Sequence, residues 1–302
     1  MISVLMLTYN RETLISRAIE SILAQTYQDL EFIIVDNGST DRSGEIADTY
    51  ATEDGRIRVI HREKGNIGAG RNTALDAARG EYLAFIDDDD WAEPDFLDFL
   101  LKLLLDNHAD IAICGAADKA FPDVKMLMSA ERALMELMRR KYYNVAFPTK
   151  LFRRELIETL RFPEDGAYDD IALMYRLLAG AKRVVYHGVP KYTFYRHESN
   201  NSAWTTHHEL LTPEILDEYL KAYRARTKWL SEKFPDRAAA WRYFEWSFMV
   251  SMVEKISRLK IEGCEAQWAA MVAELSVHRE EFLSAAEIQD FEREWIREYV
   301  LS

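Results

Sequence analysis

Four consecutive aspartates occupy positions 87–90, directly after an apolar run at 82–86. An uninterrupted apolar run of this length predicts a buried strand, so the acids are expected at its carboxyl end. Open α/β sheets bind ligands at the carboxyl ends of their strands, and grouped carboxylates there suit a hard divalent cation. A solvated acidic loop is the alternative interpretation. The first interpretation predicts a cation site, whose ion would also relieve the repulsion among the acids.

Three further loops place polar residues after expected strands, at 8–11, 36–41 and 65–72. The glycines of the third loop are spaced G-x-x-G-x-G and follow the third strand, so they match the dinucleotide fingerprint in neither spacing nor position. The Asp36-Asn37-Gly38 segment alone is equally consistent with a tight turn. Convergence of three such loops on one sheet edge favours a ligand site.

A second group of acids, Asp169 and Asp170, precedes apolar residues at helical spacing. A carboxylate in a ligand site can act as a general base that activates a hydroxyl nucleophile. The alternative is structural, because acids in the first turn of a helix interact favourably with its dipole.

The elements that must position these residues alternate along the first half of the chain. Short apolar runs predict strands at 2–8, 31–36, 57–61, 82–86 and 110–115. Amphipathic runs predict helices at 14–23, 71–79 and 94–106, with a fourth ending near residue 52. Such alternation predicts an α/β fold with a mostly parallel sheet flanked by helices.

Composition limits the classes of partner. The 302 residues are long for one compact domain and suit one large domain plus a smaller one. A net charge of -13 argues against nucleic-acid binding, which needs clustered Lys and Arg to neutralise phosphates. Cys114 and Cys264 are far apart and form neither a disulfide framework nor a metal-ligand spacing, which fits a reducing cytosol.

The motifs resemble a known family when they are taken as an ordered set. The runs TYNRETLISRAIESILAQTYQDLEFIIVDNGSTDRS and GNIGAGRNTALDAARGEYLAFIDDDDW, followed by KLFRRELIETLRFPEDGAYDDIALMYRLL, are similar to the nucleotide-sugar domain of family 2 glycosyltransferases. The resemblance covers about residues 1–202 and implies the GT-A fold. We therefore expect a catalytic domain at 1–203 and an α-helical C-terminal domain at 204–302.

The resemblance implies roles for individual residues of this sequence. The nucleotide-binding set comprises Thr8, Tyr9, Arg11, Asp36, Asn66, Gly68, Arg71, Asp87 and Asp88. Within this set, Asp36 would accept a hydrogen bond from the uracil imide of a UDP donor. In the D-x-D motif, Asp89 would bind Mn²⁺ or Mg²⁺, and four acids in a row allow the register of that motif to slip by one.

The family pattern at the second acidic pair is usually Glu-Asp, whose second acid is the catalytic base. The corresponding residues here are Asp169 and Asp170, which implies that Asp170 is the base and that Asp169, also counted as catalytic, contacts acceptor or donor. The segment YTFYRHESNNS resembles the family's site-closing segment, with one residue fewer between Arg and His. It implies that Arg196 binds phosphate or acceptor and that His197 ligates the metal or binds the diphosphate, with a structural histidine as the alternative.

The C-terminal third differs in composition. Six of the seven tryptophans lie at or after position 204, among apolar residues at helical spacing. These aromatics are expected to form a core. The surface of this domain is a candidate for contact with acceptor, with a second copy of the chain in a homodimer, or with a membrane surface. In the last case, Lys221, Arg224, Arg226 and Lys228 would face anionic lipid.

The sequence thus predicts a cytoplasmic, metal-dependent, inverting glycosyltransferase. It would move a sugar from a nucleotide donor, a UDP-sugar, to a hydroxyl of a glycan or lipid-linked acceptor in surface polysaccharide synthesis. Two alternatives stay open at this point: a non-catalytic nucleotide-sugar-binding scaffold of the same fold, and a nucleotidyltransferase, which would release pyrophosphate.

Overall fold

The computed structural model describes residues 1–158, 160–164, 169–197, 200 and 207–301. The chain divides into two compact units, Met1–Tyr195 and Arg196–Ser302. The domain boundary expected between residues 203 and 204 lies outside the described residues.

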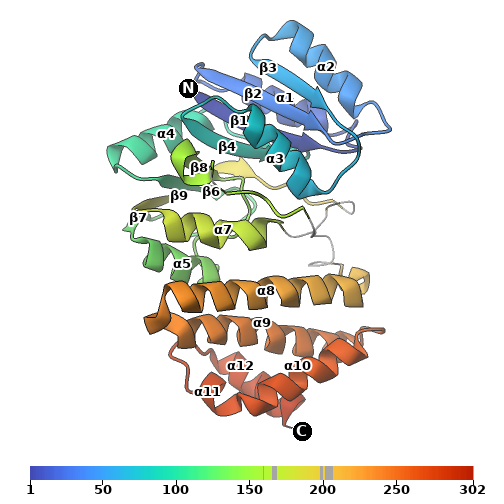
Figure 1. Cartoon of the computed structure of the whole chain (residues 1–302), viewed down its shortest axis with the longest axis vertical. Helices are drawn as coiled ribbons and strands as arrows, with labels where there is room; N and C mark the ends of the chain where they lie inside the picture. Colours follow the sequence, from blue (N-terminus) through green and yellow to red (C-terminus); the bar gives the residue numbers. More distant parts are fainter. Residues whose placement is uncertain (159, 165–168, 198–199, 201–206, 302) are drawn as a thin grey trace. The chain divides into compact units, whose positions relative to one another are not determined.

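The first unit contains a single sheet that is built, in the described ranges, from nine strands (Figure 1). They are β1 (Ile2–Thr8), β2 (Leu30–Asp36), β3 (Ile57–His61), β4 (Tyr82–Asp87), β5 (Trp91–Ala92), β6 (Ile111–Ala116), β7 (Lys125–Met128), β8 (Lys150–Arg153) and β9 (Val184–Thr193). Their order is β3-β2-β1-β4-β8-β6-β9-β5, with β7 also paired to β9. β1 to β4, β6 and β9 run in one direction, and β5, β7 and β8 run against them. The predicted α/β class with a mostly parallel sheet is confirmed.

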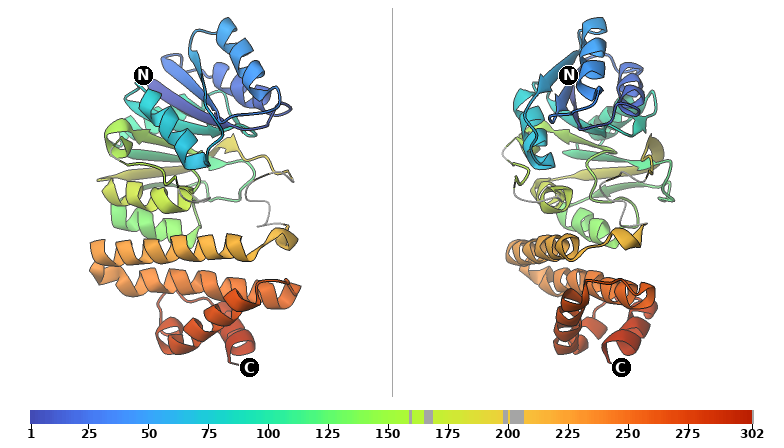
Figure 2. Two further views of the ribbon diagram at one scale, coloured as in Figure 1. Left: turned by 45° about the vertical axis from the view of Figure 1, so that its right-hand side comes forward. Right: turned by 90° about the vertical axis from the view of Figure 1, so that its right-hand side faces the viewer.

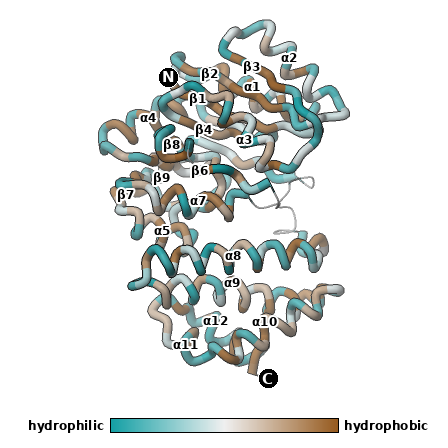
Figure 3. The backbone as a smooth tube through the Cα atoms, in the orientation of Figure 1, coloured by the Kyte–Doolittle hydropathy of each residue, from teal (hydrophilic) through white to brown (hydrophobic). Residues whose placement is uncertain are grey.

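Helices cover both faces of this sheet (Figure 2). Those of the first unit are α1 (Ile15–Leu23), α2 (Ser43–Glu53), α3 (Ile67–Ala77), α4 (Phe96–Asp106), α5 (Ala130–Arg139), α6 (Arg154–Ile157) and α7 (Asp169–Gly180). Side chains of α1 and α4 join one face of β1 and β2 in a continuous apolar core. On the other face α3 packs against β1 and β2. β1 and β2 are hydrophobic over most of their length, as Figure 3 shows, which is typical of strands buried on both faces.

α3 begins four residues earlier than the predicted helix at 71–79. Asn66 caps this helix, because its side chain accepts a hydrogen bond from the backbone N–H of Ala69 at 2.8 Å. A Cβ atom at Gly70 would lie 2.2 Å from Leu7 Cδ1 of β1, so this glycine lets the helix approach the sheet closely. The glycine-rich segment predicted as a loop is therefore largely the first turn of a helix.

The second unit is helical in its described part, as expected. Its longer helices are α8 (Pro213–Lys233), α9 (Ala238–Leu259) and α10 (Glu265–Val277), followed by α11 (Arg279–Leu283) and α12 (Asp290–Trp295). α9 packs against α8 and α10 and buries Trp241 and Trp246, which are core residues as predicted.

One of the four basic residues proposed for a lipid surface is buried. Arg226 is 5% exposed, and its guanidinium lies 4.2 Å from the ring centroid of Tyr223, so the expectation that it faces lipid is wrong. Arg224 is paired with Glu274 at 2.7 Å. Within the described chain, every helix is too short or too polar to cross a bilayer.

Candidate functional site

The expected ligand residues lie next to each other at the carboxyl ends of neighbouring strands of the sheet. In the strand registers, Thr8 is opposite Asp36, Asp36 is opposite His61, and Leu7 is opposite Asp87. Three parallel pairings therefore bring the ends of β1, β2, β3 and β4 to the same edge. The sheet thus gathers three of the four polar segments that the sequence singled out.

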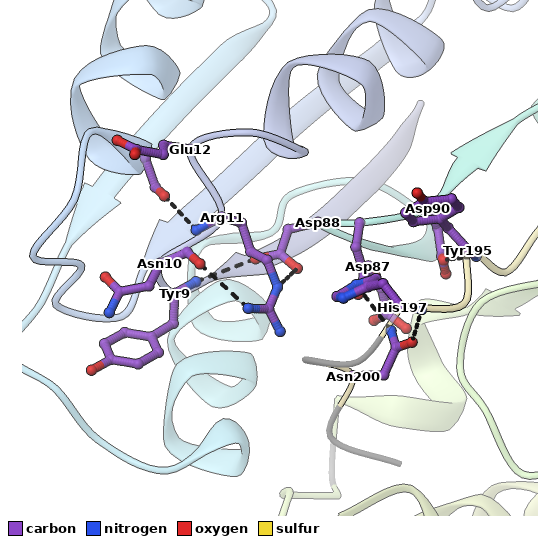
Figure 4. Close-up of polar contacts among 12 residues, drawn as sticks. Tyr9, Asn10, Arg11, Glu12, Asp87, Asp88, Asp90, Tyr195, His197 and Asn200 are labelled. Atoms are coloured by element: carbon purple, nitrogen blue, oxygen red, sulfur yellow. Dashed lines mark hydrogen bonds and ion pairs between the residues drawn. The ribbon is translucent and has the colours of Figure 1, made fainter. Parts of the chain in front are cut away.

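The acidic run is a turn whose members have different partners. Asp88 accepts a hydrogen bond from the backbone N–H of Tyr9 at 3.2 Å and forms an ion pair with Arg11 Nε at 3.7 Å (Figure 4). Burial, and then the charge of Asp89, raise the pKa of Asp88 to about 7. Asp88 thereby ties the loop after β1 to the acidic turn.

Asp90 is buried and holds the acidic turn in place. Its carboxyl accepts hydrogen bonds from the Tyr192 hydroxyl and from the Tyr195 backbone N–H, each at 2.8 Å. The Tyr192 oxygen in turn accepts from the Asp87 N–H at 3.1 Å. Burial, and then the nearby Asp87, raise the pKa of Asp90 to about 9. Both oxygens of Asp90 are thus engaged by the protein itself.

Asp89, the predicted metal ligand, is fixed through its backbone. Its carbonyl accepts a hydrogen bond from Arg17 of α1 at 2.6 Å. The Arg17 guanidinium contacts two rings, 4.2 Å from the centroid of Trp91 and 4.4 Å from that of Tyr195. Sequence reasoning missed Arg17, because its role depends on contacts between distant segments.

Arg71 of α3 joins the two predicted acidic groups. Its Nη1 lies 2.8 Å from Asp169 Oδ2, and its Nη2 lies 3.4 Å from Asp87 Oδ1. Asp169 is 4% exposed, so this ion pair is largely removed from water. Arg71 therefore brings the start of α7 to the end of β4. Its predicted contact with the nucleotide stays a prediction.

Asp170, the candidate base, follows in the first turn of α7. Its Oδ1 accepts a hydrogen bond from the Ile171 N–H at 2.7 Å. Burial, and then the charge of Asp169, raise its pKa. A carboxylate with a raised pKa is better matched to proton transfer near neutral pH than an exposed aspartate is.

Asp36 is buried at the end of β2 with a donor on each oxygen. The Ser39 N–H donates to Oδ1 at 3.0 Å, and the His61 Nδ1 lies 3.0 Å from Oδ2. Burial acts to raise the pKa of Asp36, but the hydrogen bonds from Ser39 and His61 outweigh it and lower the pKa. Asp36 is therefore an ionised acceptor, as recognition of an imide N–H requires. Sequence reasoning missed His61, although its position at the end of the third strand was a signal.

The other predicted nucleotide residues have structural explanations as well. Tyr9 lies under Lys64, whose Nζ donates to the Tyr9 hydroxyl at 2.8 Å. Asn66 caps α3, and a Cβ atom at Gly68 would lie 2.0 Å from the Pro163 carbonyl oxygen. Thr8 is buried at the end of β1. Their contacts with a nucleotide stay predictions.

Arg196 and His197 belong to the second unit. The His197 N–H donates to Asn200 Oδ1 at 2.7 Å, and the Asn200 amide nitrogen lies 3.1 Å from His197 Nε2. Their predicted roles toward phosphate and metal also stay predictions.

The donor set at the acidic turn fits a magnesium or manganese ion that is shared with a ligand. Among the described residues, no three His, Cys, Asp or Glu side chains form a preformed metal site. Mg²⁺ is commonly held by one or two carboxylates together with the phosphates of a substrate. Burial raises the pKa of Asp87 to about 6, although Arg71 opposes the rise, and a bound cation would favour the ionised form.

Comparisons with known proteins agree with this geometry. The family model described as Glycosyl transferase family 2 matches residues 3–161. EpsH of Bacillus subtilis (strain 168), a glycosyltransferase by name, is 36% identical over 214 residues, which are 66% of this chain and 62% of EpsH. The chain thus spans less than two thirds of that relative.

Two solved structures share the fold. TarS 1–349 of S. aureus, in complex with UDP-GlcNAc, has a TM-score of 0.72 at 22% identity, covering 90% of this chain and 80% of that one. The mannosyltransferase PcManGT of Pyrobaculum calidifontis, in complex with GDP-Man and Mn²⁺, has a TM-score of 0.55 at 18% identity, covering 99% and 84%. At these identities the likeness concerns the fold alone.

Proposed function

Because the chain belongs to glycosyl transferase family 2, we propose that it transfers a sugar from a UDP-sugar to an acceptor hydroxyl, with inversion at the anomeric carbon. The observation that carries the proposal is the pair of contacts made by Arg71. They place Asp169, and with it the neighbouring Asp170, beside the strand-end acids where the donor diphosphate would lie.

In this proposal the nucleoside end of the donor lies against the loops after β1 and β2. The ionised Asp36 accepts the imide N–H of uracil, and Tyr9 and Arg11 line the pocket beside it. The preference for UDP is supported by the UDP-GlcNAc complex of the structurally similar TarS. The sugar end then points toward Asp87 and α7.

Asp170 takes the proton of the acceptor hydroxyl as that oxygen attacks the anomeric carbon, and the bond from that carbon to the diphosphate breaks. Attack from the face opposite the leaving group gives inversion. Positioned proton transfer of this kind contributes roughly 10²- to 10⁴-fold to the rate. Asp89 would hold Mn²⁺ or Mg²⁺, which as a Lewis acid would stabilise the charge on the departing diphosphate.

The acceptor in this proposal is a glycan or lipid-linked saccharide of a bacterial surface polysaccharide, and the reaction occurs in the cytoplasm. The cytoplasmic assignment is supported by two buried cysteines that are both free thiols, as a reducing compartment favours. Surface residues of the helical unit would contact the acceptor, a membrane surface or a second copy of the chain.

The test combines binding with turnover. Calorimetry with UDP, GDP and TDP, each with and without Mn²⁺, is expected to show metal-dependent binding of UDP that Asp89→Ala abolishes. Release of UDP from a panel of UDP-sugars, with acceptor or water, is expected to fall by 10²- to 10⁴-fold in Asp170→Asn, which should still bind UDP.

Asp76→Asn is the matched control, because Asp76 is an aspartate on the outer surface of α3 that pairs with Arg161. It should leave both measurements unchanged. Release of pyrophosphate instead of UDP would identify a nucleotidyltransferase, and nucleotide binding without any turnover would identify a scaffold. Either result would replace the proposal.

A further inference from the structure

His61 lies between two carboxylates at the end of β3. Its Nδ1 is 3.0 Å from Asp36 Oδ2, and its Nε2 is 3.0 and 3.1 Å from the two carboxylate oxygens of Asp48 on α2. A neutral imidazole carries one N–H and one lone pair. It would therefore turn a lone pair toward one of these carboxylates. Only the imidazolium donates to both.

The local backbone is built around this contact. Gly44 is in the first turn of α2, and a Cβ atom there would lie 2.7 Å from Asp36 Oδ2 and 3.2 Å from His61 Cε1. The absent side chain leaves room for the pair to form. Asp48 lies four residues later, one turn along the same helix. α2 thus supplies both the space and the second carboxylate.

The contact fixes the orientation of Asp36, which is 6% exposed. One oxygen is held by the Ser39 N–H and the other by His61, so the carboxylate cannot rotate without losing a charge-assisted hydrogen bond. The remaining lone pairs are available only to a ligand that presents a donor. Uracil, thymine and guanine present an imide or amide N–H at the matching edge, whereas cytosine presents a lone pair there.

We propose that His61 is a positioning residue that holds Asp36 as an acceptor, and that the Asp36–His61–Asp48 array selects uracil-type over cytosine-type donors. The inference deepens the proposed function, because it rests on Asp36 facing the base of the donor.

The array also makes donor binding depend on pH. Hydrogen bonding to Asp36, and then to Asp48, raises the pKa of His61. These are the charged groups that face it, one from β2 and one from α2. As the pH rises through this raised pKa, the imidazolium loses a proton and one of its two carboxylate contacts is lost. The one N–H that is left is then shared between Asp36 and Asp48, so its donation to Asp36 weakens and affinity for UDP falls on the alkaline side.

Two substitutions at His61 separate its two contacts. The amide nitrogen of an asparagine reaches about where Nδ1 lies, and that of a glutamine reaches about where Nε2 lies. His61→Asn can therefore still donate to Asp36, whereas His61→Gln can donate only to Asp48. Asp48→Asn leaves Asp36 and its contact untouched but removes one charge that raises the pKa of His61.

The experiment is calorimetric titration of the full chain with UDP and with CDP in the presence of Mg²⁺, over a pH series. The wild type is expected to bind UDP more tightly than CDP and to lose UDP affinity toward alkaline pH.

His61→Gln is expected to bind UDP about tenfold more weakly, the scale of one charge-assisted hydrogen bond. His61→Asn should lose less affinity and show no alkaline step. Asp48→Asn should move the step to lower pH, and the surface control Asp76→Asn should not move it.

Thermal unfolding of each variant verifies that the measured protein is folded. Equal UDP affinity in His61→Asn and His61→Gln, or an alkaline step that persists in His61→Asn or stays in place in Asp48→Asn, would overturn the inference while leaving the proposed function standing. A wild type that binds no nucleotide at any pH would overturn both.

Discussion

The aspartates of the acidic turn have identical side chains, but their surroundings give them different pKa values. The pKa of Asp87 is raised to about 6, that of Asp88 to about 7 and that of Asp90 to about 9, with burial as the largest cause in each case. Asp90 has both oxygens occupied by Tyr192 and Tyr195. The position of an aspartate within the run therefore determines whether it can serve a ligand or only the fold.

Tyr192→Phe tests the structural role of Asp90. The substitution removes a donor to Asp90 and an acceptor for the Asp87 N–H, both at a buried site. We expect the free energy of unfolding to fall by about 1–3 kcal/mol, measured by denaturant titration. Tyr50→Phe removes an exposed hydroxyl contact with Glu20 and should change it by less than about 0.5 kcal/mol. Equal effects of the two substitutions would argue against the role given to Asp90.

A buried lysine in the same unit predicts an unusual dependence of stability on pH. Lys150 is fully buried, donates a hydrogen bond to the Ala146 carbonyl at 2.5 Å, and has its pKa lowered by burial to about 7. The unfolded chain binds this proton up to a higher pH than the folded chain does. Stability should therefore rise with pH between about 7 and 10, by at most about 1.4 kcal/mol per pH unit from this group.

The comparison protein is Lys150→Met, which keeps the aliphatic volume and removes the titrating group. Its free energy of unfolding, followed from pH 7 to 9 by denaturant titration, should lose this upward slope. A slope that is the same in both proteins would show that Lys150 does not cause it.

At the scale of elements, the site depends on how closely α3 approaches its neighbours. The Cβ of an alanine at Gly68 would lie 2.0 Å from the Pro163 carbonyl oxygen, a backbone atom that cannot move aside alone. Gly68→Ala should lower the free energy of unfolding by about 1–3 kcal/mol. Gly55→Ala, at a position with no atom within 4 Å, is the matched control and should be close to neutral. A Gly68→Ala protein as stable as the Gly55→Ala protein would contradict this packing.

Several elements could be predicted from sequence because their signal is local. Strands expected at 2–8 and 57–61 are β1 and β3 with the same bounds, since an apolar run between polar loops defines each. The short strands β5, β7 and β8 were not predicted, because two to four residues carry no periodicity and their pairing partners are distant in sequence. The start of α3 was misplaced because its glycines were taken as a loop signal, whereas Asn66 caps a helix there.

The residues of the candidate site also divide into those that local sequence predicts and those that depend on contacts between distant segments. The acids at strand ends could be found from composition, and the strand registers bring Asp36 and Asp87 to one edge. Arg17 and Tyr192, which hold the acidic turn, could not be found in this way, and for His61, which holds Asp36, the only signal was its position at the end of the third strand. Each acts through a contact between segments at least 25 residues apart.

At the scale of the whole molecule, the chain is two compact units. In the second unit Glu292 is 2% exposed and accepts hydrogen bonds from the Tyr243 hydroxyl at 2.7 Å, the Ser247 hydroxyl at 2.5 Å and the Gln289 N–H at 2.9 Å. This carboxylate joins α9 to the start of α12.

Glu292→Ala tests whether the units depend on each other. The variant leaves three donors without this acceptor, so its free energy of unfolding should fall by about 2–4 kcal/mol, measured by thermal and denaturant unfolding. The control is Glu294→Ala, an exposed position on the same helix, which should be nearly neutral. At temperatures where the variant is folded, its affinity for UDP should equal that of the wild type. A loss of UDP affinity in the folded variant would show that the nucleotide site is sensitive to packing inside the helical unit.

The hydrogen bond between Tyr192 and Asp90 has a consequence for engineering chimeric enzymes. The two residues are 102 positions apart, yet one hydroxyl contacts both the carboxyl of Asp90 and the backbone of Asp87. Suppose that the acidic turn is transferred into a homologous scaffold in order to exchange donor preference. The turn would then lack the Tyr192 contacts unless the end of β9 is transferred as well. The transplantable module is therefore a discontinuous pair of segments, and a crossover point placed anywhere between them would separate the turn from the tyrosine that holds it.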